Sequence, residues 1–321
     1  MFDYLKNKKI LILGATGLIG SHIIFELLRA NREEKAEITI YAMSRNLLRL
    51  KEIFGLSGDG EDGLFYVEGD VATAKLSALD YIIHGASPSH PSAFVNSPVE
   101  VMQANFLGTW NVCELAKENP GCRVLYLSSG EAGQNVDNLT VRASYPMSKK
   151  ASETLCISYS EEYNVDVRIA RICHTFGEGG LAADNKMTAQ FLRSGARAED
   201  IVMLSKGEQR RSFAYVEDVV SALLTILGKG EKGGVYEVAS DEVCSIHEFA
   251  LLCAKAGGCE VRMEAPDELN LKQRSPFADQ ILDNAKLKEL GWKPAYTIER
   301  GIEESIRRMR VKHNGKGIGS N

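Results

Sequence analysis

The 321-residue sequence has few of the features that mark disulfide-stapled, zinc-binding, nucleic-acid-binding or membrane-spanning proteins. Its seven cysteines are odd in number and form no Cys-x-x-Cys pair, which favours buried thiols in a reducing compartment. A net charge of −5 and the lack of a basic stripe argue against nucleic acid as a partner. No apolar run approaches the roughly 20 residues of a membrane span, and the first predicted strand, at Ile10, leaves no room for a signal peptide. We therefore expect a cytoplasmic protein that binds no membrane, no nucleic acid and no metal.

A strand, a glycine-rich turn and a helix are predicted near the start of the chain. Residues 10–13 are an apolar run too short for a helix and suited to a buried parallel strand. Gly14, Gly17 and Gly20 follow at three-residue intervals, and residues 21–30 predict an amphipathic helix. Such a turn directs backbone N–H groups and a helix N-terminus at a pyrophosphate. The residues expected to hold a dinucleotide are Gly14, Thr16, Gly17, Leu18, Ile19 and Gly20.

Short apolar strands alternate with helical patterns over the first 177 residues. Strands are predicted at residues 10–13, 37–43, 64–67, 81–86, 123–129 and 166–172, and long helices at 99–118 and 145–163. This alternation predicts an α/β fold, a Rossmann-type doubly wound parallel sheet. Further on, helices are predicted at 186–194, 216–227, 245–256 and 298–310, and short strands at 201–204, 235–239 and 260–263.

The change of pattern after Gly177 predicts two domains. We expect a dinucleotide-binding domain of residues 1–177, rejoined by residues 214–240. Residues 178–213 and 241–312 would form a smaller mixed α/β substrate lobe. Residues 313–321 would be a frayed tail.

Residues after the predicted strands would contact the rest of the dinucleotide. The second strand ends at Ser44 and Arg45, where an acidic residue normally binds the adenosine ribose. Arg45 would instead suit a 2′-phosphate, although a surface arginine in a loop is the alternative. Asp70 and Val71 would lie near the adenine, and small residues up to Ala86 would let the cofactor approach the backbone. The expected cofactor is therefore NAD or NADP.

A serine, a tyrosine and a lysine form a second signal. Tyr145 and Lys149 are four residues apart at the start of a predicted helix, so they share one face. A lysine one turn from a tyrosine can lower the pKa of the phenol and hold a ribose, which makes the tyrosine a base near neutral pH. Ser129 ends a predicted strand, at the edge where ligands bind in open α/β sheets.

From Lys9 to about Ile306 the chain resembles the extended short-chain dehydrogenase/reductase family of nucleotide-sugar enzymes. The resemblance rests on Gly14-Ala-Thr-Gly-Leu-Ile-Gly20, Ser128-Ser129, Tyr145-Pro-Met-Ser-Lys149, Arg171-Ile-Cys-His-Thr-Phe-Gly177, Gln209-Arg-Arg-Ser-Phe-Ala-Tyr-Val-Glu-Asp218 and Leu290-Gly-Trp-Lys-Pro294. It implies that Tyr145 removes the proton of a sugar 4-hydroxyl, while Ser129 steadies the oxygen and Lys149 holds the ribose. It also implies that Arg211 and Arg274 hold the nucleotide diphosphate. A homodimer built from the helices at 99–118 and 145–163 is a further implication.

The residues beside Ser129 bear on the reaction. In sugar 4,6-dehydratases an Asp-Glu pair follows the hydroxyl residue, whereas this chain has Gly130-Glu131 and lacks the acid for the departing 6-hydroxyl. Simple 4-epimerases need no carboxylate there. UDP-glucuronate decarboxylases keep the glutamate alone, and their proline-containing loop resembles Ala86-Ser87-Pro-Ser-His-Pro91. We therefore expect a UDP-sugar substrate at Ser87 and a decarboxylase with Glu131 as a catalytic residue. A 4-epimerase, a 4,6-dehydratase and a non-catalytic nucleotide-binding regulator are the alternatives.

The chain also departs from the family's pattern. Ala132-Gly133-Gln134 replaces the usual Val-Tyr-Gly, and Glu178 replaces a proline. His174 stands where an asparagine usually contacts the substrate, and it would either hydrogen-bond the substrate or serve as a structural histidine. The pattern identifies no arginine or lysine for a glucuronate carboxylate.

Overall fold

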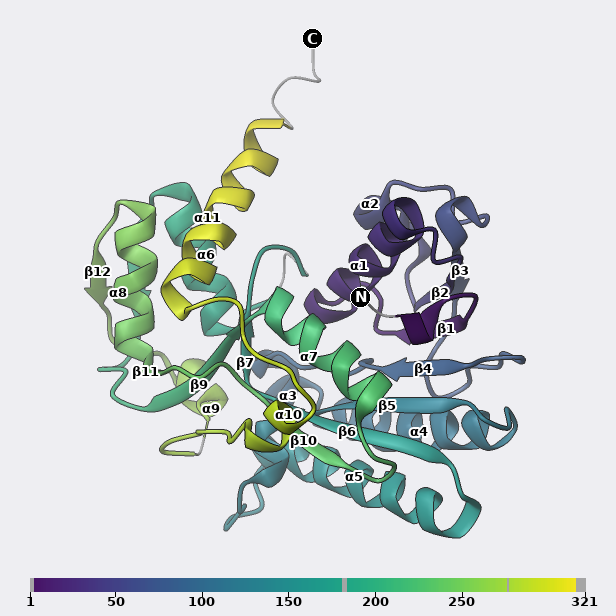
Figure 1. Ribbon diagram of the computed structural model, residues 1–321. Coiled ribbons are helices and arrows are strands. Elements are labelled where there is room, and N and C mark those ends of the chain that lie inside the picture. The colour runs from purple at the N-terminus through teal and green to yellow at the C-terminus, as the bar shows by residue number, and fades with distance from the viewer. Residues whose placement is uncertain (1–2, 181–183, 276, 316–321) are drawn as a thin grey trace.

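A computed structural model describes residues 3–180, 184–275 and 277–315 (Figure 1). The strands of its largest sheet are β1 (Lys9–Leu13), β2 (Thr39–Ser44), β3 (Leu64–Glu68), β4 (Tyr81–His84), β5 (Arg123–Ser129), β6 (Asp166–Ile172) and β10 (Val235–Val238). They are all parallel and lie in the order β10-β6-β5-β4-β1-β2-β3. The order reverses between β1 and β4, which is where ligands bind in open parallel sheets. The predicted doubly wound parallel sheet is confirmed.

Helices cover both faces of this sheet (Figure 1). One face carries α1 (Leu18–Glu34), α2 (Leu47–Phe54) and α7 (Val216–Lys229), and the other carries α4 (Pro98–Lys117) and α5 (Ser144–Tyr163). Within β1, Ile10 and Ile12 pack toward the first layer, and Leu11 and Leu13 pack toward the second. Burial on both faces explains why the strands read as continuous apolar runs.

A smaller lobe lies beside the sheet, on the left of Figure 1. Its helices are α6 (Met187–Arg197), α8 (Ile246–Gly257) and α11 (Ile298–Gly315), and its strands are β7 (His174–Phe176), β8 (Ile201–Met203), β9 (Arg210–Tyr215), β11 (Val243–Ser245) and β12 (Val261–Met263). The strands pair in the orders β11-β9-β7 and β12-β8. The lobe has its own core, in which the rings of Phe213 and Phe249 stack 4.5 Å apart.

Three short helices connect these parts: α3 (Pro91–Asn96), α9 (Glu268–Gln273) and α10 (Ala285–Glu289). Helix α3 contacts α4 and α9, so it lies between the sheet layers and the small lobe. The buried side chain of Phe94 on α3 packs with Val101 and Tyr145.

The predicted elements differ from the structure mainly at their ends. Strands β5 and β6 coincide with the predicted ranges, whereas α1 begins three residues early because Gly17, in extended conformation, is its N-cap. Helix α11 continues to Gly315, so the tail predicted from residue 313 is wrong for residues 313–315, and residues 316–321 lie outside the described residues. The elements that were not predicted are helices α2, α3, α9 and α10 and strands β7, β9 and β11. The boundaries expected for the two domains remain a prediction.

Three further features bear on the expected functions. Within the residues described, no helix has both the length and the apolar character needed to cross a bilayer. The same residues contain no cluster of three or more His, Cys, Asp or Glu side chains suited to a metal ion. All seven cysteines are free.

Candidate active site

The glycine-rich turn joins β1 to α1 at the carboxyl edge of the large sheet. Gly14 has φ 85°, and a Cβ atom there would lie 2.8 Å from the carbonyl carbon and oxygen of Gly85. A Cβ at Gly20 would lie 2.3 Å from the carbonyl oxygen of Gly14. Only glycine fits these two positions. Gly17 makes no side-chain cap, so the N–H groups of the first helical turn, which includes Leu18 and Ile19 after Thr16, face outward for a ligand. This cradle fits the pyrophosphate of a dinucleotide.

The side chains expected at the adenosine end have protein partners. The Ser44 hydroxyl accepts a hydrogen bond from the N–H of Asn46 at 3.1 Å. An Arg45 Nη atom lies 3.0 Å from a carboxylate oxygen of Glu100, and both side chains are exposed. Ser44 also stands opposite Glu68 of β3, an acidic residue that the sequence analysis did not consider. Arg45 is therefore held by a carboxylate rather than left free.

Two residues after β3 behave differently from each other. Asp70 accepts a hydrogen bond from the N–H of Ala72 at 2.9 Å and shapes the turn. The side chain of Val71 is buried and packs closely against Gly108 of α4. Only the backbone of Val71 is thus placed to meet an adenine, whereas Asp70 remains at the surface of the turn.

Tyr145 lies in the first turn of α5 and is nearly buried. Its ring stacks on that of Phe94, with centroids 4.4 Å apart and planes 23° apart. Burial raises the pKa of Tyr145 to about 12, and the charge of Glu131 adds to this, whereas Ser129 and Arg142 lower it. The phenol is therefore protonated at neutral pH.

Lys149 makes no hydrogen bond with the Tyr145 phenol among the described residues, so its effect on the pKa of Tyr145 stays a prediction. The Lys149 ammonium donates a hydrogen bond to the carbonyl of Leu127 at 2.8 Å and lies 4.8 Å from the centroid of the Tyr126 ring. It points at the strand beneath it rather than at the phenol. Burial lowers the pKa of Lys149 to about 7, so its charge is itself easily lost.

The two serines at the end of β5 have different surroundings. Ser128 donates a hydrogen bond to Glu153 at 2.6 Å, and that carboxylate also binds the guanidinium of Arg171. Ser128 is thus fixed in a buried network below the site. The Ser129 hydroxyl accepts a hydrogen bond from the N–H of Glu131 at 3.2 Å, and it lowers the pKa of Tyr145. Of the two hydroxyls, that of Ser129 is the one outside the buried network.

Glu131 forms a two-hydrogen-bond ion pair with Arg142. The Arg142 Nη atoms donate to the two carboxylate oxygens at 2.7 and 2.9 Å, and both side chains are largely buried. The guanidinium also lies 4.6 Å from the centroid of the Phe94 ring. The Arg142 Nε atom is buried and has no hydrogen-bond partner among the described residues.

The sequence analysis missed Arg142, although a signal was available. Arg142 stands three residues before Tyr145, in a short 3-10 helix (Val141–Ala143) that leads into α5. Residues three apart in a helix share a face. Its position relative to the tyrosine therefore indicates a basic group beside the phenol.

Positive charges gather around His174 of β7. Its ring lies edge-on to Phe213, and its nitrogens have no hydrogen-bond partner among the residues described. Burial lowers the pKa of His174 to about 3, and the charges of Arg211, Lys186 and Arg142 act in the same direction. His174 is thus neutral at physiological pH. Lys186, which donates to Ser89 at 3.0 Å, was not predicted.

Arg211 and Arg274 are placed differently. Arg211 is buried, and its guanidinium donates to the carbonyls of Ala278 and Phe277 at 2.5 and 3.0 Å. Arg274 is exposed and donates to the carbonyl of Leu204 at 2.7 Å. The structure gives the two arginines no shared contact. In the loop after β4, where Ser87 follows Ala86, the buried hydroxyl of Ser87 has no partner within the described residues.

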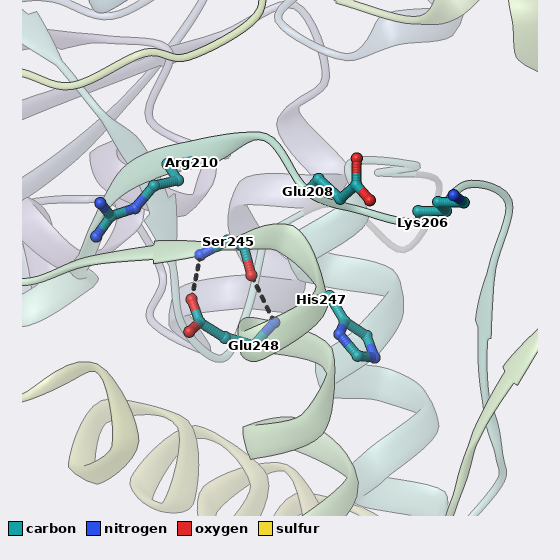
Figure 2. A pocket seen from close by; sticks show the side chains of 6 residues that line it. All are labelled: Lys206, Glu208, Arg210, Ser245, His247 and Glu248. Carbon is teal, nitrogen blue, oxygen red and sulfur yellow. Dashed lines mark hydrogen bonds between the residues drawn. The ribbon is translucent and has the colours of Figure 1, made fainter.

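A separate depression lies in the small lobe. It measures about 320 Å³ and is lined by Lys206, Glu208, Arg210, Ser245, His247 and Glu248 (Figure 2). Ser245 and Glu248 form a capping box at the start of α8. The Ser245 hydroxyl accepts from the N–H of Glu248, and the Glu248 carboxylate accepts from the N–H of Ser245. None of the predicted site residues lines this depression.

Comparison with known proteins gives a consistent family. The sequence profile of the NAD dependent epimerase/dehydratase family matches residues 10–239. The chain is 28% identical over 320 residues to UDP-glucuronic acid decarboxylase 1 of Xenopus tropicalis, covering 95% of this chain and 72% of the relative. It is 29% identical over 328 residues to UDP-glucuronic acid decarboxylase 3 of Arabidopsis thaliana, covering 96% and 92%.

Solved structures share the fold at lower identity. The dTDP-glucose 4,6-dehydratase of Streptomyces venezuelae, solved with NAD bound, superposes with a TM-score of 0.80 at 21% identity over 96% of this chain and 98% of that chain. The UDP-glucose 4-epimerase of Thermotoga maritima, solved with UDP-glucose, gives 0.77 at 20% identity over 95% and 99%. At this identity the likeness establishes the fold.

Proposed function

The chain belongs to the NAD dependent epimerase/dehydratase family, and we propose that it decarboxylates UDP-glucuronate with NAD or NADP bound at the glycine-rich turn. The curated relatives named UDP-glucuronic acid decarboxylase support this reaction, as they align over nearly the whole chain. The glycine cradle supports the dinucleotide. Solved structures that share this fold contain bound NAD, which agrees with that cofactor.

The observation that carries the proposal is the buried Glu131–Arg142 pair beside Tyr145. Both Glu131 oxygens accept hydrogen bonds from the guanidinium, and Gly130 stands where a 4,6-dehydratase has the acid for the leaving hydroxyl. The unpartnered Nε of Arg142 offers one more donor at the same place. A guanidinium with a spare donor is suited to a carboxylate, and a carboxylate is what distinguishes UDP-glucuronate from a UDP-hexose.

Charge in the rest of the site suits such a substrate. A nucleoside diphosphate sugar with a C6 carboxylate carries negative charge at both ends. Arg142, Lys186 and Arg211 all act electrostatically on His174, and they would share these anionic groups. Arg211, fixed by backbone carbonyls, would hold the diphosphate without reorganising.

The residues would act in a fixed order. A bound nicotinamide dinucleotide would supply the hydride acceptor for oxidation at the sugar C4. Tyr145 would take the proton of the 4-hydroxyl while Ser129 holds the oxygen; because the pKa of Tyr145 is about 12, binding of the ligands must lower it. The C5–C6 bond of the resulting 4-keto acid would then break, leaving its electron pair in an enolate and releasing carbon dioxide. Tyr145, which carries the proton taken from the 4-hydroxyl, would donate a hydrogen bond to the enolate oxygen. A proton taken up from solvent, through a water molecule that the Glu131 carboxylate orients, would replace the carboxyl group at C5.

We also propose a homodimer formed by α4 and α5. Their outer faces expose Met102, Leu107, Trp110 and Met147, each at least 40% accessible. Apolar side chains of this size gathered on one helical layer are typical of a protein–protein interface. Light scattering should give the mass of two chains, and the mass of one chain at working concentration would contradict this proposal. The cytoplasmic location expected from the scattered cysteines remains a prediction.

Product analysis tests the reaction. Purified protein is incubated with UDP-glucuronate, UDP-glucose and dTDP-glucose, and the products are analysed by mass spectrometry. A decarboxylase converts only UDP-glucuronate, to a UDP-pentose or its 4-keto form. A 4-epimerase gives an isomer of unchanged mass from a hexose substrate, and a 4,6-dehydratase gives a product lighter by one water. Either hexose product, without any change in UDP-glucuronate, would overturn the decarboxylase proposal.

A further inference from the structure

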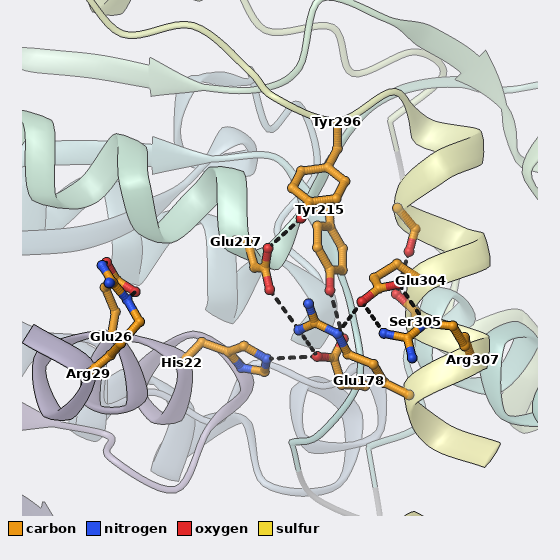
Figure 3. A network of polar contacts seen from close by, with 12 residues as sticks. His22, Glu26, Arg29, Glu178, Tyr215, Glu217, Tyr296, Glu304, Ser305 and Arg307 are labelled. Atoms are coloured by element: carbon orange, nitrogen blue, oxygen red, sulfur yellow. Dashed lines mark hydrogen bonds and ion pairs between the residues drawn. The ribbon is translucent and has the colours of Figure 1, made fainter. Parts of the chain in front are cut away.

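Glu178 is a buried carboxylate that the proposed chemistry does not use. It follows β7 in the loop that leads into the small lobe, and its side chain is 5% exposed. One carboxylate oxygen lies 2.8 Å from Arg308 of α11 and 3.7 Å from His22 of α1, and the other accepts from the hydroxyl of Tyr215 at 3.1 Å. Glu178 thus links both parts of the molecule (Figure 3).

Arg308 holds more than one carboxylate. Besides Glu178, it lies 2.6 Å from Glu217 at the start of α7 and 2.5 Å from Glu304 on its own helix. Glu217 also accepts from the hydroxyl of Tyr296 at 2.7 Å. Three carboxylates therefore converge on a single guanidinium, and the loss of this guanidinium would leave buried negative charge.

The loop that carries Glu178 rests on the pyrophosphate turn. A Cβ at Gly180 would lie 3.5 Å from the Cβ of Leu18, and a Cβ at Gly179 would lie 3.5 Å from Cε1 of His22. Leu18 is the first residue of α1, and its N–H belongs to the cradle. Arg49 of α2 fixes the same loop by donating to the carbonyl of Gly180 at 3.0 Å. The loop thus lies against the first turn of α1, whose N–H groups form the cradle.

We propose that the Glu178–Arg308 pair is a positioning device for the dinucleotide, which fastens the first turn of α1 to α11 and keeps the carboxylate beside that turn neutralised. This inference rests on the dinucleotide site proposed above. A pyrophosphate is anionic, so an unpaired Glu178 near the cradle weakens its binding. Arg308 acts through Glu178 and the loop, without touching the ligand, and both residues are positioning residues.

Substituting the two partners should lower dinucleotide affinity by unequal amounts. Arg308→Gln leaves the Glu178 carboxylate unpaired, whereas Glu178→Gln removes the charge. We expect Arg308→Gln to raise the dissociation constant of NADH or NADPH roughly tenfold, a size common for coupling between sites, and Glu178→Gln to raise it less. The double variant Glu178→Gln/Arg308→Gln should regain most of the affinity that Arg308→Gln loses. Arg308→Lys, which keeps the charge, should stay near the wild type.

The experiment titrates each variant with NADH and NADPH by fluorescence, and with UDP by calorimetry, after a thermal melt has checked the fold. Arg307→Gln is the matched control, because Arg307 neighbours Arg308 but is exposed and pairs only with Glu304 among the described residues. It should bind as the wild type does, and UDP affinity should be unchanged throughout. If Arg308→Gln does not fold, the dinucleotide affinities of Arg308→Lys and of the double variant are compared with that of the wild type.

Two results would overturn the inference. One is wild-type affinity in all variants with only lowered melting temperatures, which makes the pair purely structural. The other is a double variant that binds no better than Arg308→Gln. A wild-type protein that binds neither dinucleotide contradicts the proposed function instead, so the two failures are distinguishable.

Discussion

The Glu131–Arg142 and Glu178–Arg308 pairs join the same two chemical groups in two different settings. In the first, the partners are 11 residues apart in sequence, and the guanidinium keeps one buried donor without a partner. In the second, the partners are 130 residues apart, and every group is shared among several others. The first pair therefore keeps a buried donor available beside Tyr145, whereas the second connects α11 to carboxylates on other elements.

The largest difference in activity between the two regions is expected at Tyr145, because only the Glu131–Arg142 region contains this residue. Tyr145→Phe removes the proton acceptor but keeps the ring that stacks on Phe94. Turnover should fall below detection while the dissociation constants of NADH and NADPH stay near those of the wild type. Steady-state assays and fluorescence titrations measure the two quantities. A phenylalanine variant that turns over like the wild type would disprove the mechanism.

Glu131→Gln separates the pair's chemistry from its packing. The amide keeps the size of the side chain but accepts fewer hydrogen bonds from Arg142. Turnover should fall by roughly 10²–10⁴-fold, as expected for one acid–base group. The step after C4 oxidation should slow more than the oxidation, so the 4-keto acid should accumulate in rapid-quench samples. Equal slowing of both steps would limit Glu131 to a structural role.

The residues that these two predictions test were identified from the sequence, whereas several of their contacts were not. Spacing alone indicated Ser129, Tyr145 and Lys149, because a strand end and one helical turn are local features. It did not reveal that Lys149 points to Leu127, since the direction of a side chain depends on what packs around it. The partners of Glu131 and Glu178 were missed for a related reason. Arg142 and Arg308 are brought there by a loop and by a helix from the other end of the chain. The large sheet was predictable because its strands are short apolar runs with turns between them.

The Glu178–Arg308 pair should appear in the pH dependence of stability. Burial on its own would raise the pKa of Glu178, but hydrogen bonds from His22 and Arg308 hold it near 2, below the ordinary 4.5. A carboxyl whose pKa is depressed on folding stabilises the fold above pH 4.5, and this contribution disappears as the pH falls from about 4.5 to about 2. The shift corresponds to on the order of 3 kcal/mol.

Urea unfolding of the wild type and Glu178→Gln checks this prediction. The variant should be less stable at pH 7, and the gap between the two proteins should close as the pH approaches 2. Glu52→Gln, at an exposed end of the Arg49 ion pair, is a suitable control and should show little change. A gap that stays constant with pH would mean that Glu178 stabilises the fold through packing alone.

The smallest effect is expected at the exposed Arg45–Glu100 pair, which resembles neither buried pair. Solvent-exposed ion pairs contribute little, so a ligand phosphate can replace Glu100 at small cost. NADP should bind at least as tightly as NAD, and Arg45→Ala should lower the affinity for NADP by a few-fold while leaving NAD unchanged. Parallel titrations with NADH and NADPH test this. NAD binding far tighter than NADP would show that Arg45 does not hold a 2′-phosphate.

The central claim is that the Arg142 side of the site holds and releases a substrate carboxylate. UDP-glucuronate labelled with carbon-13 at C6 tests it most directly, with the wild type, Arg142→Gln and the exposed control Arg307→Gln. We expect labelled carbon dioxide from the wild type and from Arg307→Gln. In Arg142→Gln, the release of labelled carbon dioxide should be at least tenfold slower. Absence of labelled carbon dioxide from the wild type, or release from Arg142→Gln at the wild-type rate, would contradict it.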